Sequence, residues 1–455
     1  MGTFGELIIT LWIPICILIF CFAEVKQAIL IALVTGWLFL PVFNIRFEGL
    51  PDINKVNLTS GGVLIGASLF AFHEFFRFRF RWFDLFAIAW CFCPIPSSLV
   101  NKLGFYDGIS ASVEIFLMWG IPYLIGRIFF SDLRSRKSLV LALFIGGVIY
   151  LPFCLYEMRM SPQLHNMVYG YFPGQFGQTS RLGGWRPQVF MQHGLMLGMW
   201  MASAAVLGVW LFRKGVLQGV FWQFVVVCLV GTAILCRSAF AILLAIGATL
   251  VLFLSEKIRS RILISLLVAI PIAYMAVRTS QIWSGSDLVT TAYKIFGADR
   301  AQSISFRLFN ENLLIRKALD QPVFGWGGWG RNLVSVSEHS DKKTITDGLW
   351  IIAFGQHGIV GLAALFLMIF MSILRLHYYY PVARWDEPDV APSVALSLVV
   401  AIFAIDCLLN SMINPVMIVA IGGLTGQKSE TPSSVSVTHP QHLEWSFQDN
   451  QKVEA

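Results

Sequence analysis

The sequence predicts an all-α polytopic membrane protein with about twelve transmembrane helices and one large loop that carries short helices. Hydrophobic residues make up 56% of the 455 residues, and the mean hydropathy is +0.70. Charged residues make up only 13%, whereas a soluble chain carries roughly 25%. The apolar residues fall into long runs, and about 20 residues cross a bilayer as a helix. Because lipid offers no hydrogen-bond partner to unpaired backbone N–H and C=O groups, these runs are expected to be helical.

The apolar runs divide the chain into six parts. We expect N-terminal transmembrane helices in 1–156, a first outer loop at 157–189, central helices in 190–277, a large outer loop at 278–346, C-terminal helices in 347–424 and a disordered polar tail at 425–455. The expected spans are 7–23, 27–43, 58–74, 82–100, 110–130, 138–156, 190–212, 217–235, 238–255, 262–277, 347–374 and 391–409. A further run, 415–424, is too short to cross alone.

The basic residues between the spans predict the orientation. Arg and Lys gather in every second gap, at 73–82, 131–137, 213–214, 257–261 and 375–384. The positive-inside rule places that side in the cytoplasm, so both long loops face the periplasm or the exterior. A strict count of the spans also places the N-terminus outside. The same positions account for the net charge of +7, so no nucleic-acid partner is expected.

Ionisable residues inside the spans are sparse. Glu114, Arg237 and Asp406 are the ones that the sequence places within or at the ends of spans. A charge in the membrane is a functional hypothesis by default, because burying it is expensive. An ion-coupled transporter would place several such groups near the bilayer centre, so the scarcity of charge makes that class less favoured.

Two arginines precede the seventh span. Arg181 and Arg186 flank the sequence Gly-Gly-Trp at the outer face. They fit either an anion site built on a tight turn or ordinary interfacial anchors of a helix end. His193, where the span begins, is interpreted as a polar packing residue.

Arg237 lies in a gap of a few residues between the eighth and ninth spans. The positive-inside rule disfavours an arginine on the outer side, so this residue calls for a partner or a ligand. A guanidinium that is always charged and binds in a bidentate manner suits a diphosphate.

The large outer loop contains an expected amphipathic helix at 302–319. Phe306, Phe309 and Leu313 fit one apolar stripe, with Leu314 beside it. Arg307 and Glu311 have the spacing of an i,i+4 ion pair on a more polar side.

The same loop is more positive than an outer loop should be. Arg300, Arg307 and Arg316 lie in or just before this helix. Arg307 therefore fits a ligand contact as well as it fits a solvated helix face.

Two further stretches of the loop suggest binding or catalysis. Residues 320–330 hold four glycines in six positions, which permit a close backbone approach, and Trp326 and Trp329 fit either sugar stacking or interfacial anchoring. Asp347 precedes the next span, where it fits a helix N-cap or a general base at the outer face.

Together, these stretches resemble the O-antigen ligase and O-antigen polymerase superfamily of bacterial envelope glycosyltransferases. The resemblance covers roughly 180–424. It rests on an Arg-bearing segment before a span, Cys-Arg-Ser-Ala at Arg237, the Arg-bearing helix at Arg307, Asp-Gln-Pro-Val-Phe-Gly-Trp-Gly from Asp320, and Gly-Gln-His-Gly-Ile-Val-Gly-Leu from Gly355. Their order around a large outer loop carries the resemblance.

The resemblance implies a metal-independent transferase in the bacterial inner membrane that needs no cofactor. Its donor would be an undecaprenyl-diphosphate-linked oligosaccharide, and its acceptor a second saccharide; a chain-length regulator is a further partner that stays open. Arg237 and Arg307 take the arginine roles, and Arg186 supports them. Arg181, Arg300, Trp326 and Trp329 join the substrate-binding residues. No metal is expected, because the densest acidic cluster, 386–389, lies on the cytoplasmic side.

One departure bears on the type of transferase. Ligases of the superfamily tend to have a His near the start of the span after the large loop, where this chain has Asp347; His339 lies within the loop. A carboxylate near a helix N-terminus stays ionised and can act as the base. An aspartate in place of this histidine favours a polymerase-like or exopolysaccharide enzyme over a strict ligase.

Two other classes stay open. One is a transporter or flippase of lipid-linked saccharide, and the other is a non-catalytic partner in an envelope assembly complex. A flippase would line a central cavity with charges from many spans, and these spans carry few.

Overall fold

The computed structural model describes residues 2–46, 51–181, 183–337 and 340–426. It is an all-α, multi-pass membrane protein. The strands among the described residues are two to four residues long and pair as hairpins. The predicted polar tail and His339 lie outside the described residues, the tail from position 427 onward.

Nine helices among the described residues are long and apolar enough to cross a membrane. They are α1 (Thr3–Phe22), α3 (Lys55–Phe76), the continuous helix Phe105–Phe129, α8 (Leu133–Met160), α10 (Gly194–Arg213), α12 (Ala239–Ile258), α13 (Ile262–Thr279), α16 (Leu349–Tyr379) and α17 (Ala391–Leu409). The helix Phe105–Phe129 consists of α6 (Phe105–Ile115), the π-helical turn η2 (Phe116–Gly120) and α7 (Ile121–Phe129).

The remaining predicted spans are shorter or bent. The run 82–100 forms the 3₁₀ turn η1 (Trp82–Asp84), α4 (Leu85–Phe92) and α5 (Pro94–Val100), with a bend of 43°. Two other predicted spans form α2 (Val25–Phe39) and α11 (Val220–Leu235), of 15 and 16 residues. The run 415–424, expected to be too short to cross, forms α18 (Pro415–Thr425). Helices of this length fall short of the roughly 20 residues that a bilayer needs. The count of twelve therefore stays a prediction.

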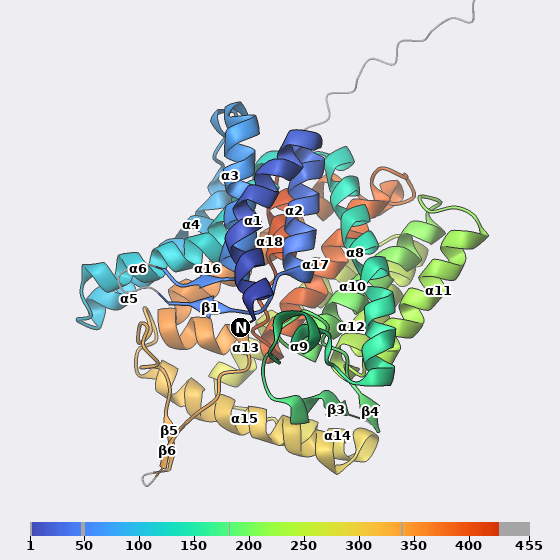
Figure 1. Cartoon of the computed structure of the whole chain (residues 1–455). Coiled ribbons are helices and arrows are strands. Elements are labelled where there is room, and N and C mark those ends of the chain that lie inside the picture. The colour runs from blue at the N-terminus through green and yellow to red at the C-terminus, as the bar shows by residue number, and fades with distance from the viewer. Residues whose placement is uncertain (1, 47–50, 182, 338–339, 427–455) are drawn as a thin grey trace, which may run out of the picture.

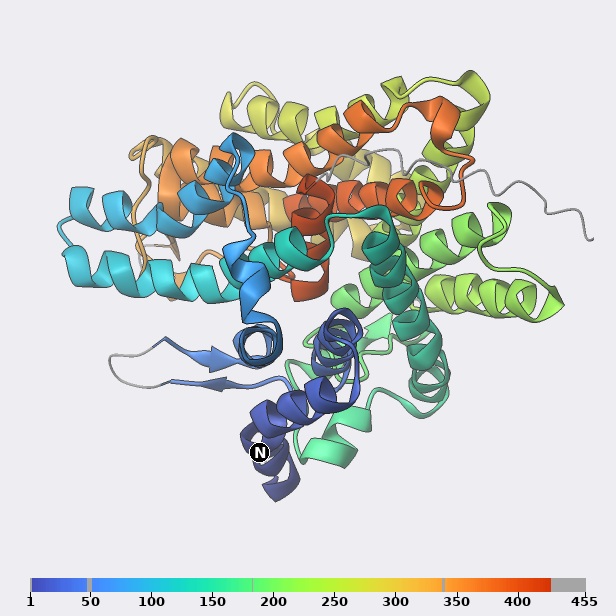
Figure 2. The ribbon, with the colours of Figure 1, turned by 90° about the horizontal axis from the view of Figure 1, so that it is seen from above.

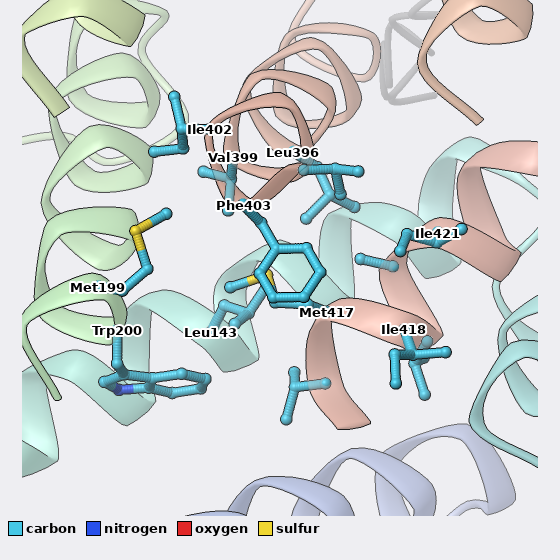
Figure 3. Packing of buried hydrophobic residues seen from close by; sticks show 14 of the residues in the cluster. Leu143, Met199, Trp200, Leu396, Val399, Ile402, Phe403, Met417, Ile418 and Ile421 are labelled. Carbon is cyan, nitrogen blue, oxygen red and sulfur yellow. The ribbon is translucent and has the colours of Figure 1, made fainter. Parts of the chain in front are cut away.

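The core lies around α17 and α18. Figure 3 shows side chains of α17, such as Phe403, meeting Leu143 of α8, Trp200 of α10 and Met417 of α18. Helix α18 approaches α7 closely, because a Cβ at Gly126 would lie 2.1 Å from the carbonyl oxygen of Val419. Small residues that let two backbones meet are how helices associate in lipid, where the hydrophobic effect gives no drive.

The outer helices keep large apolar side chains exposed. On α11, Val220, Phe221 and Phe224 are more than 60% exposed, and Leu243 of α12 is 53% exposed. α11 and α12 project on the side opposite to α5 and α6 (Figure 1, Figure 2). Apolar patches of this extent fit contact with lipid.

The basic gaps meet on one face, here called the basic face. Lys137 pairs with Asp389 at 3.6 Å, and Lys214 pairs with Glu256 at 2.8 Å and also with Asp386. Contacts that join the other gaps to this face are Arg127 with Asp84 (2.7 Å) and Arg261 with the carbonyl of His377 (2.8 Å). The 3₁₀ turn η4 (Val382–Arg384) lies here too.

The two long loops lie at the opposite end, here called the loop face. Helices α14 (Ser286–Phe296) and α15 (Ala298–Leu319) run across this end of the bundle (Figure 1). The other elements of this face are α9 (Leu164–Tyr169), η3 (Phe176–Thr179) and three antiparallel hairpins: β1 (Asn44–Ile45) with β2 (Ile53–Asn54), β3 (Ser180–Arg181) with β4 (Gly184–Trp185), and β5 (Ser335–Ser337) with β6 (Ser340–Lys343). The N-terminus is also here, since Gly2 N donates to the carbonyl of Tyr169 at 2.9 Å.

Helix α15 confirms the expected helix but not its expected faces. Phe306 and Phe309 are each 51% exposed, and the buried face carries Leu308, Leu314 and Ile315 instead. The predicted pair of Arg307 and Glu311 is wrong as well. Both side chains find stronger partners on other helices, because Glu311 accepts from Nε of Arg278 at 2.6 Å and Arg307 turns toward Asp347.

Helix α16 is broken at Gly358, whose φ is +64°. The glycine-rich segment after α15 fills the break: the N–H groups of Trp326 and Gly327 donate to the carbonyls of Gly355 and Gln356, both at 2.9 Å. A Cβ at Gly358 would lie 2.3 Å from the backbone of Val323. The close approach expected of these glycines is thus made to another part of the chain. Irregular backbone within a membrane protein is tolerated where other parts of the protein satisfy its hydrogen bonds.

Candidate functional site

A turn at 187–190 fixes the backbone that carries Arg186. The carboxylate of Glu157, at the end of α8, accepts the N–H groups of Gln188 (2.8 Å) and Val189 (2.7 Å), and also that of Leu164 (3.0 Å). Val189 takes a positive φ of 52°, a conformation that a branched side chain adopts only under constraint. The two hydrogen bonds from Gln188 and Val189 to the carboxylate supply that constraint.

Arg186 itself is buried, with 4% of its side chain exposed. Its aliphatic stem crosses the start of α10, because a Cβ at Gly194 would lie 2.3 Å from Cδ of Arg186. An interfacial anchor would leave its guanidinium in the headgroup region, so this burial does not fit that interpretation of Arg186; the anion site stays a prediction.

Arg237 joins the same site from the junction of α11 and α12. It takes a φ of +55°, and its Nη1 donates to the carbonyl of Arg181 at 2.7 Å. The guanidinium lies directly on Gly184, where a Cβ would come within 2.3 Å of Nη2. Strained conformations of this kind persist where the surroundings over-determine them, and they gather at functional sites.

His193 lies among the arginines. As the N-cap of α10, its Nδ1 accepts from the N–H of Leu195 at 3.0 Å, so the proton is on Nε2, 3.2 Å from Oε1 of Gln178. Burial, together with the charges of Arg186, Arg307 and Arg181, lowers the pKa of His193 to about 4. The imidazole is therefore neutral at pH 7, and three guanidiniums lie within electrostatic range of it.

Arg307 and Asp347 complete the site from α15 and the segment before α16. Nε of Arg307 lies 3.3 Å from Oδ2 of Asp347, and its Nη1 donates to the carbonyl of Leu409 at 3.4 Å. Oδ1 of Asn310, one turn further along α15, accepts the N–H of Ile345 at 3.0 Å. The helix thus holds the segment that carries Asp347.

Asp347 does not cap α16. The N-cap residue is Gly348, and no side chain caps it, so the N-cap interpretation is wrong. Burial raises the pKa of the Asp347 carboxyl, and the positive charge of Arg307 partly offsets this rise. A partly exposed carboxylate with a raised pKa has the properties of a general base.

We call Arg181, Arg186, Arg237, Arg307, His193 and Asp347 the arginine site. Asp406, buried at the end of α17, accepts from Nδ2 of Asn410 at 2.7 Å. The carbonyl of Asn410 in turn accepts the N–H of Leu349 at 3.3 Å. Asp406 therefore helps to fix the start of α16 close to the site.

The arginine site borders a cavity of about 730 Å³ on the loop face. Pro173, Gly174 and His193 line this cavity and also a small hollow beside Arg186. An anionic group held by the arginines would therefore have open space beside it for the rest of a ligand.

The structure does not bring Trp326 or Trp329 to the arginine site. Trp326 lies under Lys317, whose Nζ is 3.5 Å from the ring centroid, and its Nε1 donates to the carbonyl of Lys317. Lys317 is ten residues from Arg307, about 15 Å along α15. Trp329 is 80% exposed. Arg300 is in the first turn of α15, and its side chain lies outside the described residues.

Sequence reasoning missed three residues near the site. Glu157 lies near the end of α8 on the loop face, Gln178 in a loop, and Lys55 at the start of α3. A carboxylate or an ammonium at the outer end of an apolar run is the signal that could have pointed to Glu157 and Lys55. Gln178 carries no such signal.

No protein-family model matches the chain, and no curated protein matches it significantly. Within the described residues, no three or more His, Cys, Asp or Glu side chains are grouped so as to hold a metal ion. The function must therefore be argued from the arginine site itself.

Proposed function

We propose that the protein is a glycosyltransferase that polymerises or transfers saccharides linked to undecaprenyl diphosphate, and so builds an exopolysaccharide or an O-antigen-like polymer. The observation that carries this proposal is the gathering of Arg181, Arg186 and Arg307 around His193. Arg237 is bonded to the hairpin that carries Arg181, and Asp347 is paired with Arg307. Guanidiniums from three separate parts of the chain form a site for an anion with several oxygens.

The chemistry follows from the geometry of the site. Asp347 takes the proton of an acceptor hydroxyl, whose oxygen attacks the anomeric carbon of the donor sugar. The bond from that carbon to the diphosphate oxygen breaks, and the lipid diphosphate leaves with the electron pair. The arginines stabilise the negative charge that develops on the leaving group. The enzyme supplies mainly charge and orientation, since the diphosphate is already a good leaving group.

The location belongs to the proposal. The basic face is cytoplasmic by the positive-inside rule, which puts the arginine site on the periplasmic side of a bacterial inner membrane. An arginine site there meets the lipid-linked donor after that donor has crossed the membrane. The donor's lipid would remain in the bilayer and its saccharide would lie in the periplasm.

Mass spectrometry of undecaprenyl-linked saccharides, from cells with and without the gene, tests the proposal. If the protein is a polymerase, its loss leaves single repeat units on the lipid and removes long polymer. If it is a ligase, long chains remain on the lipid. An unchanged pool of lipid-linked saccharide would overturn both forms of the proposal.

The same cells distinguish the transporter alternative from the transferase. If the protein is a flippase, its loss would leave single repeat units on the cytoplasmic leaflet. In spheroplasts, a sugar-cleaving enzyme added from outside cannot reach them there. The packing of α17 does not favour a transporter, because the buried side chains of this helix are apolar apart from Ser393, Ser397 and Asp406. Repeat units protected from the external enzyme would favour transport.

A further inference from the structure

Lys55 is a buried lysine that the proposed chemistry does not use. It is the first residue of α3, at the loop face, and only 7% of it is exposed. Its Nζ donates to the carbonyl of Phe190 at 2.8 Å and lies 5.6 Å from the ring centroid of Trp37. Among the described residues, no carboxylate forms an ion pair with it.

Such an ammonium is costly to bury. One carbonyl uses one of its three N–H donors, and an aromatic face compensates the charge only in part. A buried charge normally has a counter-ion, and without one its desolvation is not repaid. An anionic group of a ligand would supply the missing compensation.

The position of Lys55 allows a ligand to reach it. It lines the cavity of about 730 Å³, within the range of roughly 300–1,000 Å³ that small-molecule sites occupy. The positive charges of the arginine site lie at the edge of the same cavity, at His193. The cavity therefore has basic side chains on two sides, which favours an anion over a neutral ligand.

The rest of the lining suits a saccharide. Asn44, Asn54 and Gln192 offer amide groups to hydroxyls, and Phe43 and Phe172 offer aromatic rings to the apolar faces of sugar rings. A lipid chain would not use amide groups, and a free inorganic anion would leave most of the space empty.

We infer that this cavity binds the saccharide portion of the substrate, and that Lys55 recognises a carboxylate on one of its sugars. The polymer would then contain an acidic sugar such as a uronic acid. The inference rests on the proposed function, since it places a sugar next to the diphosphate held by the arginine site. It assigns the class of saccharide, which the arginine site alone leaves undetermined.

The test is the binding of soluble trisaccharides to the purified full-length protein in nanodiscs, measured by calorimetry. The probes are α-1,4-linked trigalacturonate and the neutral galactotriose of the same linkage. Trigalacturonate is expected to bind about tenfold to a hundredfold more tightly, the range for one hydrogen bond to a charged group. Equal affinities, or no binding of trigalacturonate, would overturn the inference without any variant.

Lys55→Met should lower the affinity for trigalacturonate to that for galactotriose. Lys294→Met is the matched control, because Lys294 is an exposed lysine of α14 on the same face. If Lys55→Met lowers the affinity for inorganic pyrophosphate as much as that for trigalacturonate, Lys55 belongs to the diphosphate site and the inference is wrong. Should Lys55→Met fail to fold, Lys55→Gln is measured in its place, because the arginine site alone could give the wild-type protein a preference for trigalacturonate.

These results separate a failure of the inference from a failure of the proposed function. A protein that binds both trisaccharides equally, yet is required for polymer in cells, would retain the transferase and lose only the acidic sugar. A protein that selects trigalacturonate but leaves the lipid-linked pool unchanged would retain the saccharide site and lose the transferase.

Discussion

Arg237 and Arg259 allow a direct comparison of two single side chains. Both are arginines with a positive φ, at +55° and +54°, and both lie where one helix ends and the next begins. Arg237 is on the loop face and donates to the hairpin that carries Arg181, whereas Arg259 is exposed on the basic face. A purely conformational role would make the two equally sensitive to substitution.

Arg237→Ala is expected to reduce polymer formation by about 10²- to 10³-fold, as the loss of one preorganised donor to a developing charge does. Arg259→Ala is the control and should leave the polymer at the wild-type level. The measurement is the amount of polymer in complemented cells, with both proteins quantified in the membrane fraction. Normal polymer with Arg237→Ala would remove that residue from catalysis.

Asp347→Asn removes the base but keeps the shape of the side chain. The transfer rate should fall by about 10²- to 10⁴-fold, the usual contribution of general base catalysis. Asp320→Asn, at the exposed end of α15, is the control for a lost negative charge on the same face. A transfer assay with purified protein and lipid-linked donor measures both, and a full rate with Asp347→Asn would contradict the assignment.

The raised pKa of Asp347 predicts the pH dependence. The carboxylate acts as a base only when ionised, so activity is present above its pKa and is lost as the pH falls through it. The acidic limb should therefore lie above the ordinary value for aspartate, about 3.9. The single-turnover rate, measured from pH 4 to 8 together with the unfolding midpoint at each pH, checks this. A rate that stays constant down to an ordinary aspartate pKa would contradict the prediction.

At the scale of elements, the broken helix α16 shows how two segments distant in sequence depend on each other. The break leaves carbonyl and N–H groups open, and Pro322 to Gly327 satisfy them. Nδ2 of Asn101, after α5, also donates to the carbonyl of Gly325 at 2.7 Å. The glycine-rich segment thus joins α5, α15 and α16, and it fixes where α15 ends.

Gly358→Ala should destabilise this junction. The new Cβ would lie 2.3 Å from the backbone of Val323 and would have to adopt a φ of +64°, at a cost of about 1–3 kcal/mol. Gly247→Ala is the matched control, because nothing lies within 4 Å of that position in α12, and there alanine should add about 0.5–1 kcal/mol. Thermal unfolding in detergent should shift the two midpoints in opposite directions, and a shift in the same direction would count against the break.

At the scale of the whole molecule, charge divides the two ends of the bundle. The basic gaps pair with acidic residues such as Glu256 and Asp389 on one face. The other face concentrates guanidiniums around His193 with Asp347 as the paired carboxylate. The positive-inside rule accounts for the first face only. The second is an excess of positive charge that topology does not require, which is why it points to a ligand.

The predicted orientation can be measured directly. In a variant that lacks its eight native cysteines, a cysteine at Lys294 should react with an impermeant thiol reagent added to intact spheroplasts. A cysteine at Arg259, exposed on the opposite face, should react only after the membrane is opened. Reversed labelling would place the arginine site in the cytoplasm, away from a donor that has already crossed the membrane.

The sequence alone determined the class of the molecule and the position of most of its helices. Apolar runs of about 20 residues leave no choice but helix in lipid, and the basic gaps assigned the two faces. The same patterns identified Arg186, Arg237, Arg307 and Asp347 as candidate site residues, because charge near an apolar run is conspicuous. The lengths of α2 and α11 differ from the predicted runs 27–43 and 217–235, since packing decides where a run stops being helical.

Only the tertiary structure decided which side chains meet. The pairing of Arg307 with Asp347 rather than Glu311 depends on how α15 rotates over the bundle, and helical spacing gives no information on a partner in another helix. Glu157 and Lys55 act through backbone groups more than 30 residues away in sequence. Hydrophobic patterning is local and fixes elements, whereas hydrogen bonds and ion pairs between elements require three-dimensional neighbours.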